Sequence, residues 1–380
     1  MNKFFELIQI SMGLKDQFHA SPSAEEWQDL FAESQRQTLS GFVFTGIEKL
    51  PLSQRPPKQL MLQWYMLVAK LEDMNRHLNT RCIQVSKRFS EDGFMCCILK
   101  GQGNAVMYPN PYRRQCGDID IWLLTQEEYS KSTTDWKKSR DKILDYVLKL
   151  FPNESVRYHH VEFPALKDVA IEVHYIPIYV QNPFGQKNLV NFFLKHKEEA
   201  FSNYVNLPEN TGKICVPTPR FNAIYQLSHI FIHFIIEGIG LRHFVDYYYV
   251  LKNLQQSDHN YIQKELRKIN LYGFSQATMY LLKEVLGLEE EYLISSPDEK
   301  KGKVLISEIL EGGNFGKYGT KYWHEDSGLL MKNWDKLKRN MHFLTSYPGE
   351  IIFEPFSRVV RTLYCKRVKK RALKRLTKST

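Results

Sequence analysis

"RRQCGDIDIWLL", residues 113–124, is the stretch that decides the fold. Its second half alternates with a period of two, which predicts a buried β-strand. One face carries Ile119, Ile121 and Leu123, and the other carries Asp118, Asp120 and Trp122. Same-side residues on a strand lie only about 6.6 Å apart, so the two carboxylates repel each other unless a cation lies between them. The strand therefore either ends at a solvated edge or holds a cation.

A third carboxylate lies in "VAIEVHY", residues 169–175, where Glu172 and His174 share one face of a second predicted strand. Burying a glutamate in such a strand is costly unless it is paired or bound to a metal. If the two strands are neighbours, three carboxylates converge, and these oxygen ligands suit Mg²⁺ or Mn²⁺. Two such ions can clamp the oxygens of a phosphoryl or nucleotidyl displacement. Alternatively, Glu172 pairs with Arg113 or Arg157 and is structural.

Groups that could bind phosphate stand near these carboxylates in the sequence. "LKGQG" ends a predicted strand and starts a short helix, so backbone N–H groups at Gly101 and Gln102 and the charge of Lys100 could contact phosphate oxygens. The loop before the acidic strand carries Arg113 and Arg114, and arginine suits bidentate phosphate contact.

The whole chain predicts an α+β fold, in which a small mixed β-sheet is flanked by N-terminal and C-terminal helical regions. In the core, strands are expected at "FMCCILKG" and "DIDIWLL", a helix over 125–151, and a hairpin formed by "VRYHHVEFPAL" and "VAIEVHYIPIYV". An apolar stripe with spacings of three and four predicts one long helix from Gln59 to Phe89. The predicted divisions are helices over 1–90, the core over 91–185, helices over 186–345 and a basic tail over 346–380.

The net charge of +10 is concentrated in that tail. Residues 357–380 hold ten Lys and Arg and no acid, which leaves 42 basic and 42 acidic residues in the rest of the chain. Apolar residues recur every fourth position from Val360 to Leu376, which predicts an amphipathic basic helix. It is either a solvated terminal helix or a contact for a polyanion such as RNA, an acidic partner or an anionic membrane. We expect a chain that ends at Phe356 to keep nucleotide binding and to lose association with polyanions, unless the apolar residues pack on the body.

Composition bounds the class of protein. With 380 residues, 43% of them hydrophobic and 25% charged, the chain resembles an ordinary globular protein of two or three subdomains. No apolar run approaches the roughly 20 residues of a transmembrane segment. The six cysteines show no CxxC spacing, so we interpret them as reduced thiols of a cytoplasmic protein.

The ordered motifs resemble a known family. "LKGQGNAVMYPNPYRRQCGDIDIW" followed by "IEVHY" is similar to the bacterial family of uncharacterised nucleotidyltransferases, the fifth such grouping, within the DNA polymerase β-like superfamily. The matching positions include Lys100, Gly101, Arg114, Gly117, Asp118, Asp120, Glu172 and His174, and "GIGLRHFVDYYYVL" adds Arg242 and Asp246. The superfamily usually has Gly-Ser or Gly-Gly in the phosphate turn, whereas this chain has Gly101-Gln102.

The resemblance implies a nucleotidyltransferase core and a metal-dependent reaction. An acceptor hydroxyl would attack the α-phosphorus of a nucleoside triphosphate, with ATP as the expected one, and pyrophosphate would leave. Asp118, Asp120 and Glu172 would be the catalytic and metal-binding residues, with Mg²⁺ or Mn²⁺ bound and Glu172 as a ligand or general base. The nucleotide would contact Lys100, Gly101, Gln102, Arg114 and Gly117. The acceptor could be a small molecule, a protein or RNA.

Two other functions stay open at this point: a catalytically inert nucleotide-binding or adaptor protein with the same fold, and a metal-dependent triphosphate hydrolase. Several residues also have structural interpretations. His174 is expected to orient Glu172 or fill the site wall, and of His159 and His160 at most one should face the site because strand neighbours alternate. Arg242 and Asp246, four apart on a helix, form an ion pair or face the cleft together with Arg113 and His160. His229 and His233 are interpreted as core or cleft histidines.

Overall fold

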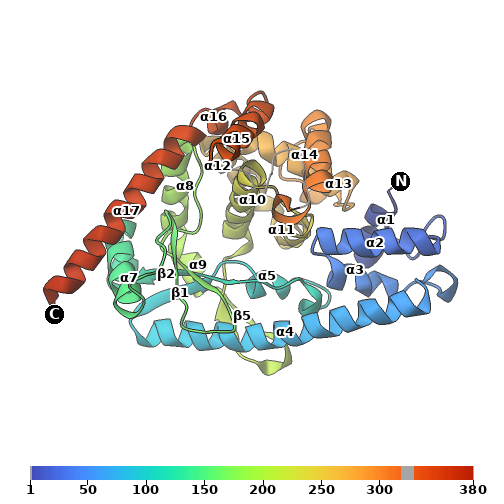
Figure 1. Ribbon diagram of the computed structural model, residues 1–380, viewed down its shortest axis with the longest axis horizontal. Helices are drawn as coiled ribbons and strands as arrows, with labels where there is room; N and C mark the ends of the chain where they lie inside the picture. Colours follow the sequence, from blue (N-terminus) through green and yellow to red (C-terminus); the bar gives the residue numbers. More distant parts are fainter. Residues whose placement is uncertain (1, 318–328, 380) are drawn as a thin grey trace.

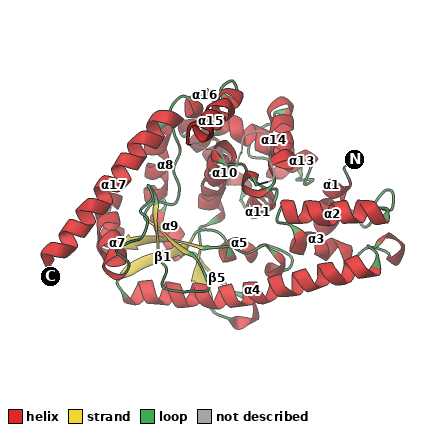
Figure 2. Cartoon of the chain, viewed as in Figure 1, coloured by secondary structure: helices red, strands yellow, loops and turns green. Residues whose placement is uncertain are grey.

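The computed structural model describes residues 2–317 and 329–379. Helices dominate it, and the strands form one small sheet and one two-stranded ribbon (Figure 2). The N-terminal region is helical as predicted and contains α1 (Lys3–Ser11), α2 (Ala24–Arg36), α3 (Ser40–Ile47) and α4 (Lys58–Glu91).

The sheet has four strands in the order β1-β2-β4-β3, and they are β1 (Phe94–Ile98), β2 (Ile119–Thr125), β3 (His160–Glu162) and β4 (Ile171–His174). β2 pairs antiparallel with β1 and parallel with β4, while β3 and β4 form an antiparallel hairpin. This confirms the predicted mixed sheet. It also makes the Asp118–Asp120 segment and the Glu172 strand direct neighbours.

The two faces of β2 enter two different cores, as the alternation predicts. Ile119, Ile121 and Leu123 are buried in a cluster with side chains of α4 and α7 (Trp136–Leu150). On the other face, Trp122 packs against Phe201 with ring centroids 4.5 Å apart. The long helix α4 runs along the bottom of Figure 1, under the sheet. Asp120 therefore lies on the side away from α4 and α7.

The apolar stripe of α4 is largely where the sequence predicts it, except that one predicted member is exposed and its neighbour is buried. Trp64, Leu71, Leu78 and Phe89 are buried, but Met74 is 47% exposed. Asn75 is buried in its place, because its Nδ2 donates to the carbonyl oxygens of Tyr112 and Arg114, at 2.7 and 2.9 Å. A polar residue in the stripe thus fixes the loop that leads into β2.

The helix predicted over 125–151 is wrong in its continuity. Thr125 caps α6 (Gln126–Tyr129), accepting from the backbone N–H of Glu128 as predicted, but the helix stops there and α7 begins only at Trp136. The buried Lys197 explains the break. Its Nζ lies 2.6 Å from the carbonyl oxygens of Tyr129 and Lys131, so it holds the intervening loop in a non-helical path.

The region after the sheet is mainly helical, but the prediction of helix alone is wrong. A two-stranded antiparallel ribbon, β5 (Tyr204–Asn206) and β6 (Lys213–Cys215), interrupts it. Residues 318–328 of the predicted C-terminal helical region lie outside the described residues. The helices are α8 (Pro183–Lys195), α9 (Lys197–Ser202), α10 (Pro219–Ile236), α11 (Arg242–Lys252), α12 (His259–Lys268), α13 (Tyr272–Glu284), α14 (Glu299–Gly312), α15 (Leu329–Phe343) and α16 (Pro348–Ile351).

The basic tail forms one long helix, α17 (Glu354–Ser379), which crosses beside α7 on the left of Figure 1. Val368 and Ala372 are buried in the core shared with α4 and α7, and Arg375 pairs with Asp145 at 2.7 Å. Val360, in contrast, is 64% exposed. The tail is thus packed against the body at Val368 and Ala372, which supports the alternative that its apolar residues pack on the body over a fully solvated helix. No described helix is long and apolar enough to cross a membrane.

Candidate active site

The acidic residues meet because of the register of two parallel strands. Asp120 pairs with Glu172, and Trp122 pairs with His174. Neighbouring strands lie about 4.8 Å apart, so side chains of paired residues face the same side at close range. A cavity of about 760 Å³ opens there, and Asp118, Asp120, Glu172 and His174 line it. The predicted convergence of the three carboxylates is therefore present.

His174 joins the two strands chemically. Its Nδ1 lies 3.1 Å from the carbonyl oxygen of Pro177, and since a carbonyl only accepts, this nitrogen carries the proton. Its Nε2 lies 3.0 Å from Asp120 Oδ1 and 3.5 Å from Glu172 Oε2. Although burial lowers it, these two carboxylates raise the pKa of His174 to about 9.

The pKa values of the buried Asp120 and the half-buried Glu172 are both lowered, which keeps both carboxylates ionised. Although burial raises them, the pKa of Asp120 is lowered by Lys100 and His174, and the pKa of Glu172 is lowered to about 2 by His174 and the neighbouring His160. A carboxylate with so low a pKa is a weak proton acceptor and a good ligand. For Glu172 this favours the ligand role over the general-base role.

Lys100 lies against Asp120 and not in open space. Its Nζ is 3.1 Å from Asp120 Oδ2 and 3.1 Å from His229 Nε2. Burial lowers the pKa of Lys100, but Asp120, Asp118 and Glu172 outweigh this effect and raise it. The lysine therefore stays charged at the floor of the cavity, where it is a resident cation beside the carboxylates.

The carboxylates fit a divalent cation. One ligand atom each from Asp120, Glu172 and His174 lie within 4.8 Å of one another, and the buried Asp120 Oδ2 accepts no hydrogen bond of good geometry although Lys100 is near. Carboxylate oxygens suit Mg²⁺ or Mn²⁺, and a histidine whose other nitrogen donates to a carbonyl is a common metal ligand. Asp118 lines the same cavity but is outside this three-residue cluster.

The phosphate turn differs from its predicted form. Gly101 has φ of +62°, which glycine favours, and it begins α5 (Gln102–Ala105), a helix too short to supply a strong dipole. Gln102 points away from the cavity, since its Nε2 donates to Asn79 Oδ1 on α4 at 2.6 Å. Gly117 does line the cavity, directly before Asp118.

The predicted arginines have unequal positions. Arg113 is turned away and pairs with Glu48 and Glu72. Arg114 is 3% exposed, and its Nε and Nη2 bind both oxygens of Asp246 at 2.8 and 2.7 Å. Arg242 instead lines the cavity. The predicted Arg242–Asp246 pair is thus wrong as an exclusive ion pair, because Arg114 occupies both oxygens of Asp246, and Arg242 is the arginine facing the site.

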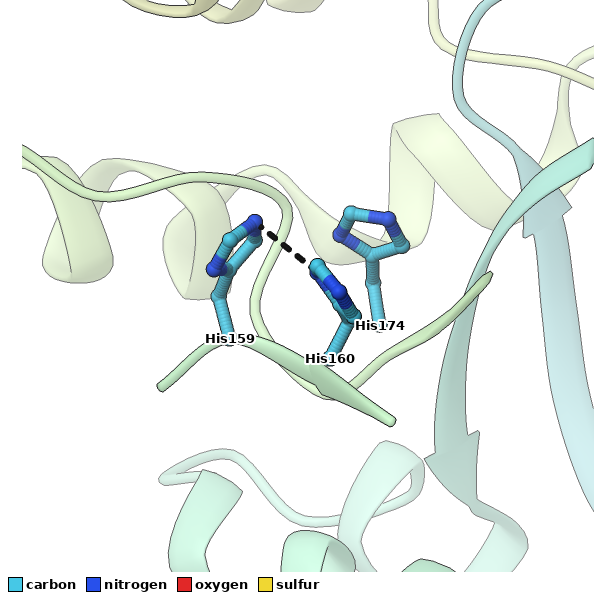
Figure 3. Close-up of side chains that lie close together, drawn as sticks. All are labelled: His159, His160 and His174. Carbon is cyan, nitrogen blue, oxygen red and sulfur yellow. Dashed lines mark hydrogen bonds between the residues drawn. The ribbon is translucent and has the colours of Figure 1, made fainter. Parts of the chain in front are cut away.

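Histidines form the other wall of the cavity. The rings of His159, His160 and His174 gather where β3 begins and β4 ends (Figure 3), and His159 Nε2 and His160 Nδ1 are 3.1 Å apart. The expectation that only one of the first two faces the site is wrong, since both line it. β3 begins only at His160, so strand alternation does not orient His159. His229 and His233 also line the cavity, as cleft histidines.

The chain is similar to one family of known proteins. A family model described as "uncharacterised nucleotidyltransferase" matches residues 23–287, which include the whole sheet and the cavity residues up to Arg242. The chain belongs to this family. Searches of curated proteins and of solved structures found no match. The match to this family covers the predicted core and the helices from α2 through α13.

Proposed function

We propose that the protein is a metal-dependent nucleotidyltransferase that moves a nucleoside monophosphate from a triphosphate, ATP in the first place, to an acceptor hydroxyl. The observation that carries the proposal is the register of Asp120 with Glu172, which places two ionised carboxylates and His174 in one cavity. Family membership supports the reaction class. A divalent cation bound there would neutralise the triphosphate and polarise its α-phosphorus.

Other side chains in the cavity would bind the triphosphate, complete the metal site and accept the hydroxyl proton. Lys100 and Arg242 line the cavity and are the cations that could contact the triphosphate. Asp118 directly precedes β2 and would complete the set of metal ligands together with Asp120 and Glu172. The acceptor oxygen bonds to the α-phosphorus as the bond to the β-phosphate oxygen breaks. The hydroxyl proton then passes to solvent or to a neutral cavity histidine such as His160, whose pKa burial and His174 lower to about 4.

The fate of a labelled triphosphate tests the proposal. The protein is incubated with Mg²⁺ or Mn²⁺, a cell extract and ATP labelled at either the α or the γ phosphate, and then the remaining nucleoside triphosphates are tried. Nucleotidyl transfer predicts α label in a larger product, γ label in pyrophosphate, and no transfer with EDTA. γ label released as inorganic phosphate would instead indicate a hydrolase.

One observation favours an alternative. Lys100 Nζ already stands 3.1 Å from Asp120 Oδ2, as a resident cation would in a site that binds no metal. An inert nucleotide-binding or adaptor protein would then bind the triphosphate without releasing pyrophosphate. Calorimetry with a non-hydrolysable ATP analogue, run with and without Mn²⁺, separates the two cases. An affinity that does not change with Mn²⁺ would support the inert protein.

A further inference from the structure

A second cavity adjoins the candidate active site, and its charged side chains are almost all basic. It has a volume of about 560 Å³ and lies between the start of the β3–β4 hairpin, the end of α10, α15 and the inner face of α17. Seven of its lining residues are Lys or Arg and one, Glu354, is acidic. His159, His160 and Tyr179 line both cavities. We call this second cavity the basic groove.

Much of the charge in the basic groove is uncompensated. Within residues 2–317 and 329–379, Arg157, Lys336 and Lys366 have no ion-pair partner, and Arg157 and Lys366 are exposed. Arg361 lies over the ring of Tyr179, 4.4 Å from its centroid, at the junction of the two cavities. The acid Glu354 is already engaged by Arg358, 3.5 Å away. An anion entering the groove would therefore meet cations with no competing carboxylate.

The positive charge continues beyond the groove along one ridge of α17. Lys366, Lys370, Lys374 and Lys378 recur every fourth residue, so they form a single row on the helix surface. All four are exposed. At about 1.5 Å of rise per residue, the row extends about 18 Å along the helix. A small phosphorylated molecule would fill the groove alone, whereas a nucleic-acid strand would contact the row as well.

We infer that the acceptor is a single-stranded nucleic acid, whose backbone phosphates lie along the Lys366–Lys378 row and in the basic groove, and whose terminal hydroxyl enters the active-site cavity past His159 and His160. The inference rests on the proposed function for the role of the strand as acceptor. The groove and the lysine row themselves do not depend on it. The acidic centre then holds the cation and triphosphate, and the basic groove holds the polyanion.

Fluorescence anisotropy of a labelled 12-nucleotide RNA of mixed sequence, with the full chain and without ATP, tests the inference. Two charge-matched pairs are compared with the wild type: Arg157→Gln with Lys366→Gln in the groove, and Lys374→Gln with Lys378→Gln on the row. A third pair, Lys58→Gln with Lys70→Gln, is the control, because both lysines are exposed in the first half of α4 and line neither cavity. Thermal melts check that each variant is folded.

For single strands each phosphate contact contributes about 0.7 to the slope of log affinity against log salt. Each experimental pair should therefore weaken binding by roughly 20-fold at 0.1 M salt and reduce that slope by about 1.4. The control pair should leave both nearly unchanged. Equal losses in all three pairs, or no RNA binding by the wild type, would overturn the inference.

The lysine row separates the acceptor classes. If the groove pair alone loses affinity for RNA and the row pair keeps the wild-type affinity, the result would indicate a small phosphorylated acceptor and overturn the inference of a polymer. Binding to anionic phospholipid vesicles but not to RNA would also overturn it, since Phe356, Val359 and Leu363 form an exposed apolar stripe on α17. RNA binding with label transferred to another acceptor but not to RNA would overturn the inference and leave the proposed function intact. RNA binding with no transfer of label to any acceptor would refute the proposed function and leave the RNA-binding surface intact.

Discussion

Asp120 is a buried carboxylate that contacts both His174 and Lys100 in the candidate active site. One oxygen lies 3.0 Å from His174 Nε2, and the other lies 3.1 Å from Lys100 Nζ without a well-aligned hydrogen bond. An ionised carboxylate is costly to bury, and two cations beside it offset that cost. An arrangement of this kind can accept a divalent cation only if one of the two resident cations moves or loses its proton.

His174 should become a nitrogen ligand when Mn²⁺ binds. Its Nδ1–H bond to Pro177 leaves Nε2 directed at Asp120 and Glu172. Pulsed electron paramagnetic resonance of the Mn²⁺-loaded protein should show a nitrogen coupling that His174→Gln removes. His160→Gln, the control in the neighbouring ring, should keep the coupling. A spectrum with no nitrogen coupling in the wild type would restrict the site to oxygen ligands.

Arg114 and Asp246 are expected to stabilise the fold and not to bind the triphosphate. Both are buried, and their side chains form two hydrogen bonds. Asp246→Asn should cost about 3–5 kcal/mol, because it leaves the buried guanidinium without a counter-charge. The half-exposed pair of Arg220 and Asp258 is the control, and Asp258→Asn should cost less than about 1 kcal/mol. Equal urea midpoints for the two variants would contradict this assignment.

At the scale of elements, the parallel pairing of β2 with β4 creates the site. The sequence predicts both strands from their alternation, and it predicts which face of each is polar. Neither pattern states which strands are neighbours, so the convergence of Asp120 with Glu172 depends on the pairing. The end of α6 at Tyr129 was not predictable from the local sequence, because Lys197, which holds the following loop, is distant in sequence. The burial of Asn75 was not predictable either, because the loop carbonyl that it binds is equally distant.

The candidate site follows the same pattern. Asp118, Asp120, Glu172 and Lys100 were predictable because each stands in a recognisable local motif. The failure of Arg113 to face the cavity was not, since its partners Glu48 and Glu72 lie on α3's end and α4, far upstream. The basic groove was predictable only in part. The sequence shows the charge of α17, but not that the helix places Arg361 and Lys366 in a cavity that shares His159 and His160 with the active site.

Removal of α17 should destabilise the protein. Val368 and Ala372 are buried against α4 and α7, and burial of a single valine contributes about 1.5–3 kcal/mol. A chain ending at Phe356 should therefore melt roughly 5 °C or more below the full chain. The Lys370→Gln, Lys374→Gln variant keeps the packing and loses charge only, so its melting temperature should be unchanged. A truncated chain as stable as the full one would show that the packing of α17 contributes little.

Glu350 on α16 should make stability depend on pH. It is buried, and burial raises its pKa to about 7 although the N–H groups of Gln181 and Asn182 bond to it. Since the folded pKa exceeds the unfolded one, stability is fully present below about pH 4.5 and is lost as the pH rises through 7, by roughly 3 kcal/mol at most. Glu350→Gln should flatten the urea midpoint between pH 5 and 8. The exposed control Glu291→Gln should leave the wild-type slope.

At the scale of the whole molecule, the acidic cluster and the basic groove lie in two adjoining cavities, although Lys100 and Arg242 also line the first. Asp118, Asp120 and Glu172 line one, and seven cationic side chains line the other. A transferase for an anionic acceptor needs this division, because the cation that binds the triphosphate and the surface that binds the acceptor must not neutralise each other. His159 and His160 are partly buried and line both cavities.

Nucleotidyl transfer by Glu172→Gln, compared with Glu162→Gln, tests the central claim most directly. The two glutamates pair across β3 and β4, but only Glu172 lines the cavity. With α-labelled ATP, Mn²⁺ and cellular RNA, we predict that Glu172→Gln transfers label at least roughly 100-fold more slowly than the wild type, while Glu162→Gln transfers at the wild-type rate and both variants keep the wild-type melting temperature. Equal rates for both variants and the wild type would contradict the account.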